Sequence, residues 1–419
     1  MYDAAIKALH GENQQKVLSN LYPDAKHQTE RYLHLINRHK DLFNSKGELY
    51  LLSAPGRSEI IGNHTDHNNG VVLACSVNLD TVCVVSKRED MRVNLASEGY
   101  EEISLSLENL QADERLAGTS KALILGVADG MKKRGCQIGG FDAVMSSKVL
   151  SGSGLSSSAA FEVLICFVLD VLYNGAKMDA VTRAQIGQYA ENVFFMKPSG
   201  LMDQMASSFG GLVQIDFKDK DPKVESLHYS FSQKGYAMVI VNTRSSHDDL
   251  TDAYSAIPRE MKQAANVAGG SVLRDVPYYS FLKALPAIRE QAGDRAVLRS
   301  LHFYQENERV LKAANALNND DLEMFFSVIN ASGLSSETQL QNIHVKDQEQ
   351  PMTLALALAR TVLKDEGACR VHGGGFAGTT LNFVPEAKLG DFTKAMENAF
   401  GPDCCHELDV RQEGPVWIR

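Results

Sequence analysis

The sequence predicts an α+β protein with two lobes. Strand-like and helix-like segments alternate along its 419 residues, but without the regular strand–helix–strand repeat of a doubly wound parallel sheet. A charged, polar segment at residues 218–223 interrupts the apolar pattern and marks the expected passage between the lobes. We therefore expect an N-terminal lobe of residues 1–225 and a C-terminal lobe of residues 226–419.

The individual elements follow from the spacing of apolar residues. Residues 1–47 have a helical pattern and form an expected N-terminal helical extension. The β-forming run at residues 48–62 is expected to end at Pro55 and Gly56, because proline cannot donate a hydrogen bond to a neighbouring strand. Buried helices are expected at residues 155–173 and 182–195, strands at residues 71–88, 141–149, 210–217 and 236–243, and a strand–glycine turn–strand unit at residues 369–385.

The composition limits the possible partners and compartments. The formal net charge is -10, and an acidic surface repels both nucleic acid and anionic membranes, so we expect neither as a partner. The sequence starts without a basic segment followed by an apolar run, so no signal peptide is expected. Seven cysteines, an odd number without a CxxC pair, argue against a disulfide framework and favour a reducing cytoplasm. A monomer or a weak homodimer is the expected assembly.

Residues 152–160, with the sequence GSGLSSSAA, have the composition of a phosphate-binding loop. Its glycines allow the backbone to approach a bulky anion, and its serines begin a predicted helix, whose first N–H groups attract phosphate. Serine hydroxyls can also bind Mg²⁺. An ordinary capped helix would have the same composition. The GxxxxGK[ST] motif with its lysine is absent, so the charge of a nucleotide must be neutralised elsewhere.

Three other segments carry candidate functional residues. Residues 54–70, APGRSEIIGNHTDHNNG, concentrate amide, imidazole and carboxylate groups between two apolar strands, which suits the paired hydroxyls of a polyol. Residues 372–380, HGGGFAGTT, contain more glycine than a hairpin requires, so something is expected to approach that backbone closely. Asp203 precedes helix-like sequence, where a lone aspartate would most simply be an N-cap.

In this order the four segments resemble the GHMP kinases, and within them the galactokinases. The family signature GRxNxIGxHxDY is matched by GRSEIIGNHTDH, PxGxGLSSSA by the loop that begins at residue 152, GIMDQ by residues 200–204, and GGGFGG by residues 373–378. The resemblance extends over about residues 48–385. It implies a mixed-sheet N-terminal lobe, a ferredoxin-like C-terminal lobe and an active site in the cleft between them. ATP, Mg²⁺ and a galactose-like sugar are the implied ligands.

The resemblance assigns roles at the nucleotide side of that cleft. It implies that Asp203 orients or deprotonates the anomeric hydroxyl of the sugar. Arg57 would lower the pKa of this carboxylate and stabilise charge on the transferred phosphoryl group. Glu191 and Ser158, or Ser157 instead, would bind Mg²⁺. The expected ATP-binding residues are Gly152, Ser153, Gly154, Leu155, Ser156, Ser157 and Ser158.

On the sugar side, the resemblance implies that side chains and backbone share the sugar hydroxyls. The expected contacts are His64, Asp66, Asn63, Tyr254 and the backbone at Gly200 and Gly373.

Two positions of the sugar segment depart from the family pattern. Asn63 replaces a glutamate and His67 replaces a tyrosine. We expect Asn63 to lie beside the substituent on carbon 5 of the sugar. An amide there removes a repulsion that would exclude uronic acids, so Asn63→Glu should favour galactose over galacturonate. If Asn63 does not contact the sugar, Glu59 is the expected replacement.

The sequence is also compatible with alternatives to a galactose 1-kinase. The nearest are 1-kinases for galacturonate, arabinose or N-acetylgalactosamine. A different class is the galactose sensor, which binds ATP and sugar without turnover. Since the predicted catalytic and metal-binding residues are all present, the sequence favours an enzyme.

Overall fold

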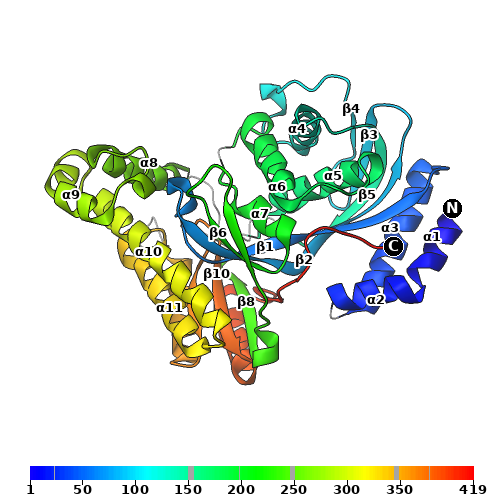
Figure 1. Cartoon of the computed structure of the whole chain (residues 1–419). Helices are drawn as coiled ribbons and strands as arrows, with labels where there is room; N and C mark the ends of the chain where they lie inside the picture. The colour runs from blue at the N-terminus through cyan, green and yellow to red at the C-terminus, as the bar shows by residue number, and fades with distance from the viewer. Residues whose placement is uncertain (23, 150–154, 198, 246–250, 344–348, 377) are drawn as a thin grey trace.

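Two β-sheets and the helices packed on them make up the fold (Figure 1). The computed structural model describes all residues except 23, 150–154, 198, 246–250, 344–348 and 377. The first sheet has the order β12-β1-β2-β5-β3-β4, and β6 and β7 extend it from β2. Its strands are β1 (Leu49–Ile61), β2 (Val71–Lys87), β3 (Arg92–Ser97), β4 (Ile103–Ser106), β5 (Phe141–Ser147), β6 (Leu212–Asp216), β7 (Lys223–Leu227) and β12 (Val416–Trp417).

Helices cover both faces of the first sheet because its strands are apolar on both sides. Leu52 of β1 and Val85 of β2 face one core, whereas Leu51 and Val84, one residue earlier, face the other. The first core includes α4 (Ser120–Lys133), α5 (Ser157–Tyr173) and α6 (Ala180–Tyr189). The second core includes α1 (Tyr2–Leu9), α2 (Glu12–Leu21) and α3 (Ala25–Phe43).

The second sheet is antiparallel, with the order β11-β8-β10-β9. Its strands are β8 (Tyr236–Asn242), β9 (Ala368–His372), β10 (Thr379–Pro385) and β11 (Cys405–Leu408). Helices α10 (Asp294–Asn318) and α11 (Leu322–Ser335) share one core with it, and α12 (Pro351–Leu363) and α13 (Leu389–Phe400) share the other. Helices α8 (Thr251–Val267) and α9 (Tyr278–Ala292) pack against α10 at the end of the molecule that lies left in Figure 1.

Most predicted elements are present, but the expected end of the first strand is wrong. β1 continues through Pro55 and Gly56 to Ile61. Its register against β2 shifts between Pro55 and Arg57, so the proline occupies a bulge, where a missing N–H donor is tolerated. The bulge therefore bends the strand instead of ending it.

The chain returns to its first sheet at its end. β12 pairs with β1 through Leu52 and Trp417, and Val77 forms a bridge with Val410. The lobe boundary expected near residue 225 falls inside β7, which pairs with β6 of the first sheet. The division into two lobes stays a prediction. Within the described part of the chain, no helix is long and apolar enough to cross a membrane.

A buried carboxylate joins this returning segment to the N-terminal helices. Asp80 of β2 pairs with Arg31 of α3 at 2.7 Å and with Arg411 at 3.2 Å. It also accepts hydrogen bonds from Tyr22 and Ser53. Burial raises the pKa of Asp80, but the two arginines and the hydroxyl donors lower it more, so the pKa lies below its ordinary value. The carboxylate is therefore ionised and fully paired.

Candidate active site

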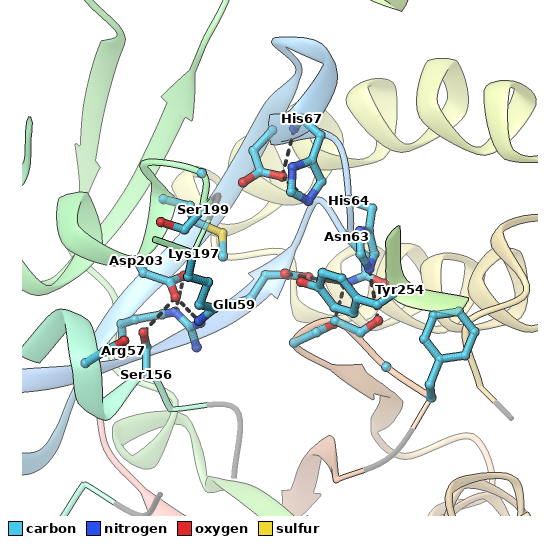
Figure 2. A pocket seen from close by; sticks show the side chains of 18 of the residues that line it. Arg57, Glu59, Asn63, His64, His67, Ser156, Lys197, Ser199, Asp203 and Tyr254 are labelled. Atoms are coloured by element: carbon cyan, nitrogen blue, oxygen red, sulfur yellow. Dashed lines mark hydrogen bonds and ion pairs between the residues drawn. The ribbon is translucent and has the colours of Figure 1, made fainter. Parts of the chain in front are cut away.

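A cavity of about 720 Å³ lies where the four predicted segments meet (Figure 2). It is lined by side chains from β1 and the loop after it, from the start of α5, from α7 (Met202–Phe209), from α8 and from the turn between β9 and β10. The first and last of these segments are more than three hundred residues apart in the sequence. The fold therefore brings chemically active residues from all four predicted segments to one cavity.

Arg57 and Asp203 form a two-point ion pair in this cavity. Arg57 follows the bulge in β1, and Asp203 lies in the first turn of α7, where Leu201 is the N-cap. Arg57 Nε donates to Oδ1 of Asp203 and Nη2 donates to Oδ2, both at 2.7 Å. Ser156 Oγ donates to the same Oδ2, also at 2.7 Å. This geometry fixes the orientation of the carboxylate.

The surroundings of this pair keep both groups charged. Burial raises the pKa of Asp203, but the charge of Arg57 and the hydrogen bonds outweigh it, so the pKa is below its ordinary value. Burial lowers the pKa of Arg57, but the charge of Asp203 raises it further. At neutral pH, Asp203 is an anionic acceptor for a hydroxyl proton and Arg57 is a fixed positive charge.

The start of α5 lies directly against this pair. Leu155 is buried, and its carbonyl accepts a hydrogen bond from the backbone N–H of Arg57 at 3.2 Å. Ser156 has a left-handed backbone with φ of 54°, and the helix begins at Ser157. The predicted residues Gly152, Ser153 and Gly154 lie outside the described residues. The described part of the loop thus places the N-terminus of α5 beside Asp203.

Glu191 occupies a short π-helix, Ala190–Phe194. Such one-turn widenings of a helix are frequent at functional sites because they change the direction of a side chain. Glu191 is buried, and its carboxylate accepts four hydrogen bonds. The donors are Ser158 Oγ at 3.3 Å, Ser199 Oγ at 2.7 Å, Gln204 Nε2 at 2.9 Å and Lys197 Nζ at 3.2 Å.

The group around Glu191 suits a magnesium ion. Mg²⁺ prefers oxygen ligands, and in nucleotide sites it is held by one or two protein oxygens together with phosphates and water. Ser158 and Glu191 supply a hydroxyl and a carboxylate within hydrogen-bond distance of each other. The ammonium group of Lys197 already forms an ion pair with the Glu191 carboxylate, so a cation can bind at this position. Among the described residues, no cluster of three or more acidic, histidine or cysteine ligands exists.

Gln204 connects Glu191 to a second buried carboxylate, Glu162 of α5. The amide Nε2 donates to Glu162 and to Glu191, both at 2.9 Å. Burial, followed by the charge of Glu191, raises the pKa of Glu162 well above its ordinary value. The amide next to Asp203 therefore holds Glu191 in place against α5.

Asp66 and Gly200 approach each other across the other side of the cavity. The backbone N–H of His67 donates to Asp66 Oδ1 at 2.9 Å, which fixes the carboxylate. A Cβ atom at Gly200 would lie only 1.9 Å from Asp66 Oδ2. A side chain at position 200 would therefore displace the Asp66 carboxylate from this position.

His64 presents a free imidazole nitrogen in the same region. Its Nε2 lies 2.9 Å from the carbonyl oxygen of Gly374 and donates to it, because a carbonyl oxygen can only accept. Burial, followed by the charge of His67, lowers the pKa of His64 to about 3. Nδ1 is buried and has no partner among the described residues. This nitrogen can accept a hydrogen bond from a hydroxyl.

Asn63 has its polar atoms engaged by neighbouring protein groups. Its Nδ2 donates to Gly373 O at 2.6 Å and to Glu59 Oε1 at 3.1 Å. Its Oδ1 accepts from Asn342 Nδ2 at 2.7 Å. Glu59 also lines the cavity, and its Oε1 forms an ion pair with Nη1 of Arg370 at 3.0 Å. A carboxylate thus reaches this part of the cavity from position 59, next to the amide at position 63.

The glycine turn between β9 and β10 allows close packing over the cavity. Gly373 and Gly375 have positive φ of 66° and 82°. A Cβ atom at Gly374 would lie 2.1 Å from the ring of Tyr254, which also meets His64 edge to face. Tyr254 of α8 and the turn therefore enclose the sugar-side residues together.

Sequence reasoning missed several residues in and around this cavity. Three residues that contact Glu191 were not predicted, namely Lys197, Ser199 and Gln204. A lysine, a serine or a glutamine does not by itself indicate a functional site. Gln204 had one available signal, since it belongs to the DQ pair of the motif around Asp203. The contacts of Lys197 and Ser199 with Glu191 depend on the path of the chain after the π-helix, which the sequence does not show.

Comparisons with known proteins define the class. The description "GHMP kinases N terminal domain" matches residues 122–211, and "Galactokinase galactose-binding signature" matches residues 37–87. Among solved structures, mevalonate kinase of Methanococcus jannaschii aligns with a TM-score of 0.62 and 15% identity, covering 88% of this chain and 99% of its own. The fold is that of the GHMP kinases.

Two galactokinases are more similar. That of Streptomyces coelicolor is 30% identical over 370 residues, which cover 87% of this chain and 91% of the relative. The crystal structure of Lactococcus lactis galactokinase complexed with galactose aligns with a TM-score of 0.77 and 24% identity, covering 91% of this chain and 98% of its own. This chain belongs to the galactokinase family and is a sugar 1-kinase.

Proposed function

We propose that this enzyme transfers the γ-phosphoryl group of ATP to the anomeric hydroxyl of galactose. The observation that carries the proposal is the ionised Arg57–Asp203 pair between a helix N-terminus and a cluster of hydroxyl-binding groups. The family supports galactose as the acceptor, because a relative of the same fold is described as a complex with this sugar.

The phosphoryl group requires positioning and charge more than a strong base, because its transition state is loose. Asp203 would accept the hydrogen bond of the attacking hydroxyl and take up its proton. Arg57 would hold this carboxylate in orientation and stabilise charge on the moving group. Both roles agree with the charged states that the surroundings impose on the pair.

The nucleotide would lie at the start of α5, where N–H groups attract phosphate. The predicted loop residues from Gly152 to Ser158 would surround its phosphates. Glu191 and Ser158 would hold Mg²⁺, which supplies charge neutralisation for the transferred phosphate. The sugar would lie between Asp66, His64 and Tyr254, against the backbone of Gly200 and Gly373. Asn63 borders the same end of the cavity.

A panel of sugars tests the proposal directly. Galactose, galacturonate, arabinose and N-acetylgalactosamine are each incubated with MgATP, and release of ADP is measured together with the position of the new phosphate. We expect the highest kcat/KM for galactose and a phosphate on its anomeric oxygen. A higher kcat/KM for another sugar, or phosphate on another oxygen, would contradict the proposal.

Substitution of Glu191 should change the metal requirement. Glu191→Gln removes a charge of the expected ligand set while keeping its shape, so the Mg²⁺ concentration for half-maximal activity should rise about tenfold. The measurement is a Mg²⁺ titration at fixed ATP. Glu260→Gln is a suitable control, because Glu260 is a buried carboxylate paired with Arg299 outside the cavity. An unchanged requirement in Glu191→Gln would remove the carboxylate from the metal site.

Asn63 and Glu59 should differ in how they set sugar preference. Asn63→Glu places a second carboxylate beside Glu59, so galacturonate should lose more kcat/KM than galactose. Glu59→Gln keeps the shape and removes the charge, so galactose should lose about threefold or more, as expected for a charged acceptor made neutral. If the ratio of kcat/KM for galactose to kcat/KM for galacturonate changes only in Glu59→Gln, then Glu59, and not Asn63, contacts the sugar. If this ratio is unchanged in both variants, neither residue determines the sugar preference.

The remaining expectations concern compartment and assembly. All seven cysteines are free thiols and five of them are buried, which suits a reducing cytoplasm. A cytoplasmic enzyme that acts as a monomer or weak homodimer, without a nucleic acid or membrane partner, stays a prediction. Size-exclusion chromatography with light scattering measures the assembly.

A further inference from the structure

Lys197 lies at the nucleotide side of the cavity (Figure 2). Its Nζ is 3.2 Å from Oε1 of Glu191, and Ser158 Oγ donates to that same oxygen at 3.3 Å. The lysine ammonium is therefore bound to the carboxylate oxygen that, with Ser158, makes up the expected metal site. A monovalent protein cation and a divalent ion would compete for this oxygen.

The backbone brings Lys197 back over Glu191. Met196, directly before it, has a left-handed φ of 63°, which reverses the chain after the π-helix. The Lys197 N–H then donates to the carbonyl of Glu191 at 3.1 Å. The Lys197 side chain is 60% exposed, whereas that of Glu191 is 3% exposed. The ammonium can thus leave the carboxylate without a loss of core packing.

Lys197 is also the cation available to a second anion. Of the cavity-lining groups in the described part of the chain, Arg57 and Lys197 are the permanently charged cations. Arg57 is held by both oxygens of Asp203. Lys197 acts on Asp203 as well, since its charge contributes to the lowered pKa of that carboxylate. A flexible lysine between Glu191 and Asp203 is positioned to reach a phosphate bound there.

We propose that Lys197 is an exchangeable counter-ion of the nucleotide site. Without nucleotide, its ammonium neutralises Glu191. With MgATP bound, Glu191 and Ser158 would hold the metal ion, and the ammonium of Lys197 would move onto the phosphates. Lys197 thereby supplies part of the charge that a lysine of a GxxxxGK[ST] loop would supply. The inference rests on the proposed kinase function and on the expected metal site.

The proposal predicts two effects of opposite sign for Lys197→Met. Binding of Mn²⁺, used as a paramagnetic substitute for Mg²⁺, should tighten by about three- to tenfold in the nucleotide-free protein, because the competing charge is gone. The free Mn²⁺ signal in electron paramagnetic resonance measures this affinity without any turnover. In contrast, kcat with MgATP should fall about tenfold or more, because a charge facing the phosphates is lost.

Lys133→Met is the matched control. Lys133 has a side chain of 59% exposure and pairs with Asp129 at 2.8 Å, but it does not line the cavity. Its Mn²⁺ affinity and kcat should equal those of the unmodified protein. Lys197→Arg keeps the charge, so it should retain most of kcat and should not tighten Mn²⁺ binding.

Two results would overturn the proposal. One is a Mn²⁺ affinity in Lys197→Met that is equal to or weaker than that of the unmodified protein, including no binding by either. The other is an unchanged kcat. Neither result would affect the proposed kinase function, because that function fails only if the unmodified protein does not phosphorylate the sugar.

Discussion

Replacement of Asp203 by asparagine should lower kcat by about 100-fold or more, the usual order for a positioned acid–base group. The amide keeps the shape of the side chain and can still accept from Ser156, but it carries no charge and cannot take up the proton of the hydroxyl. The measurement is steady-state turnover at saturating galactose and MgATP, with ATP binding followed separately by calorimetry.

A loss of structure must be distinguished from a loss of chemistry in this variant. Asp203→Asn leaves the charge of Arg57 without its anionic partner, and an unpaired buried charge is destabilising. The thermal unfolding transition therefore has to be recorded with the kinetics. A folded variant that binds ATP and retains near-normal turnover would exclude Asp203 from the mechanism. A folded, inactive variant would support its proposed role.

Substitution of Arg57 by alanine should produce the other large effect, a fall in kcat of about 10²- to 10³-fold, as for other groups that stabilise developing charge. The KM for galactose should change much less, because the charge acts mainly while the phosphoryl group moves. Initial rates over a range of galactose concentrations separate the two parameters.

Arg57→Lys provides the appropriate comparison. A lysine restores the positive charge but cannot make the two parallel hydrogen bonds to Asp203. It should recover only part of kcat if orientation of Asp203 matters in addition to charge. If Arg57→Ala raises KM and leaves kcat unchanged, the arginine contributes to binding of the sugar and not to catalysis.

Much of the fold was predictable because long apolar runs determine it. The run from Leu155 to Tyr173 forms the buried helix α5, and the run of residues 71–88 forms the long strand β2. The four motif segments were also recognisable as separate pieces, and described residues from each of them line one cavity. Local composition was sufficient for these elements, because each depends on neighbours in the sequence.

Other features depended on contacts that no local pattern contains. Pro55 looked like the end of a strand, but pairing with β2 on one side tolerates it in a bulge. The pattern at residues 182–195 predicted an ordinary helix. The π-helix that contains Glu191 was not predicted, because its residues are the same types that form an α-helix. The sequence also gave no sign that the amide of Asn63 forms hydrogen bonds with Gly373 and Asn342, which come from distant segments.

The return of the chain to its first sheet affects the order in which the protein can mature on the ribosome. Asp80 is synthesised early, yet one of its two arginine partners, Arg411, and the β12 strand that covers the edge of β1 come more than three hundred residues later. Until residues 411–418 are available, β1 lacks its β12 partner and Asp80 is paired with Arg31 alone. These two interactions therefore form only after the other strands of the first sheet have been synthesised, and β1 has an unpaired edge until then.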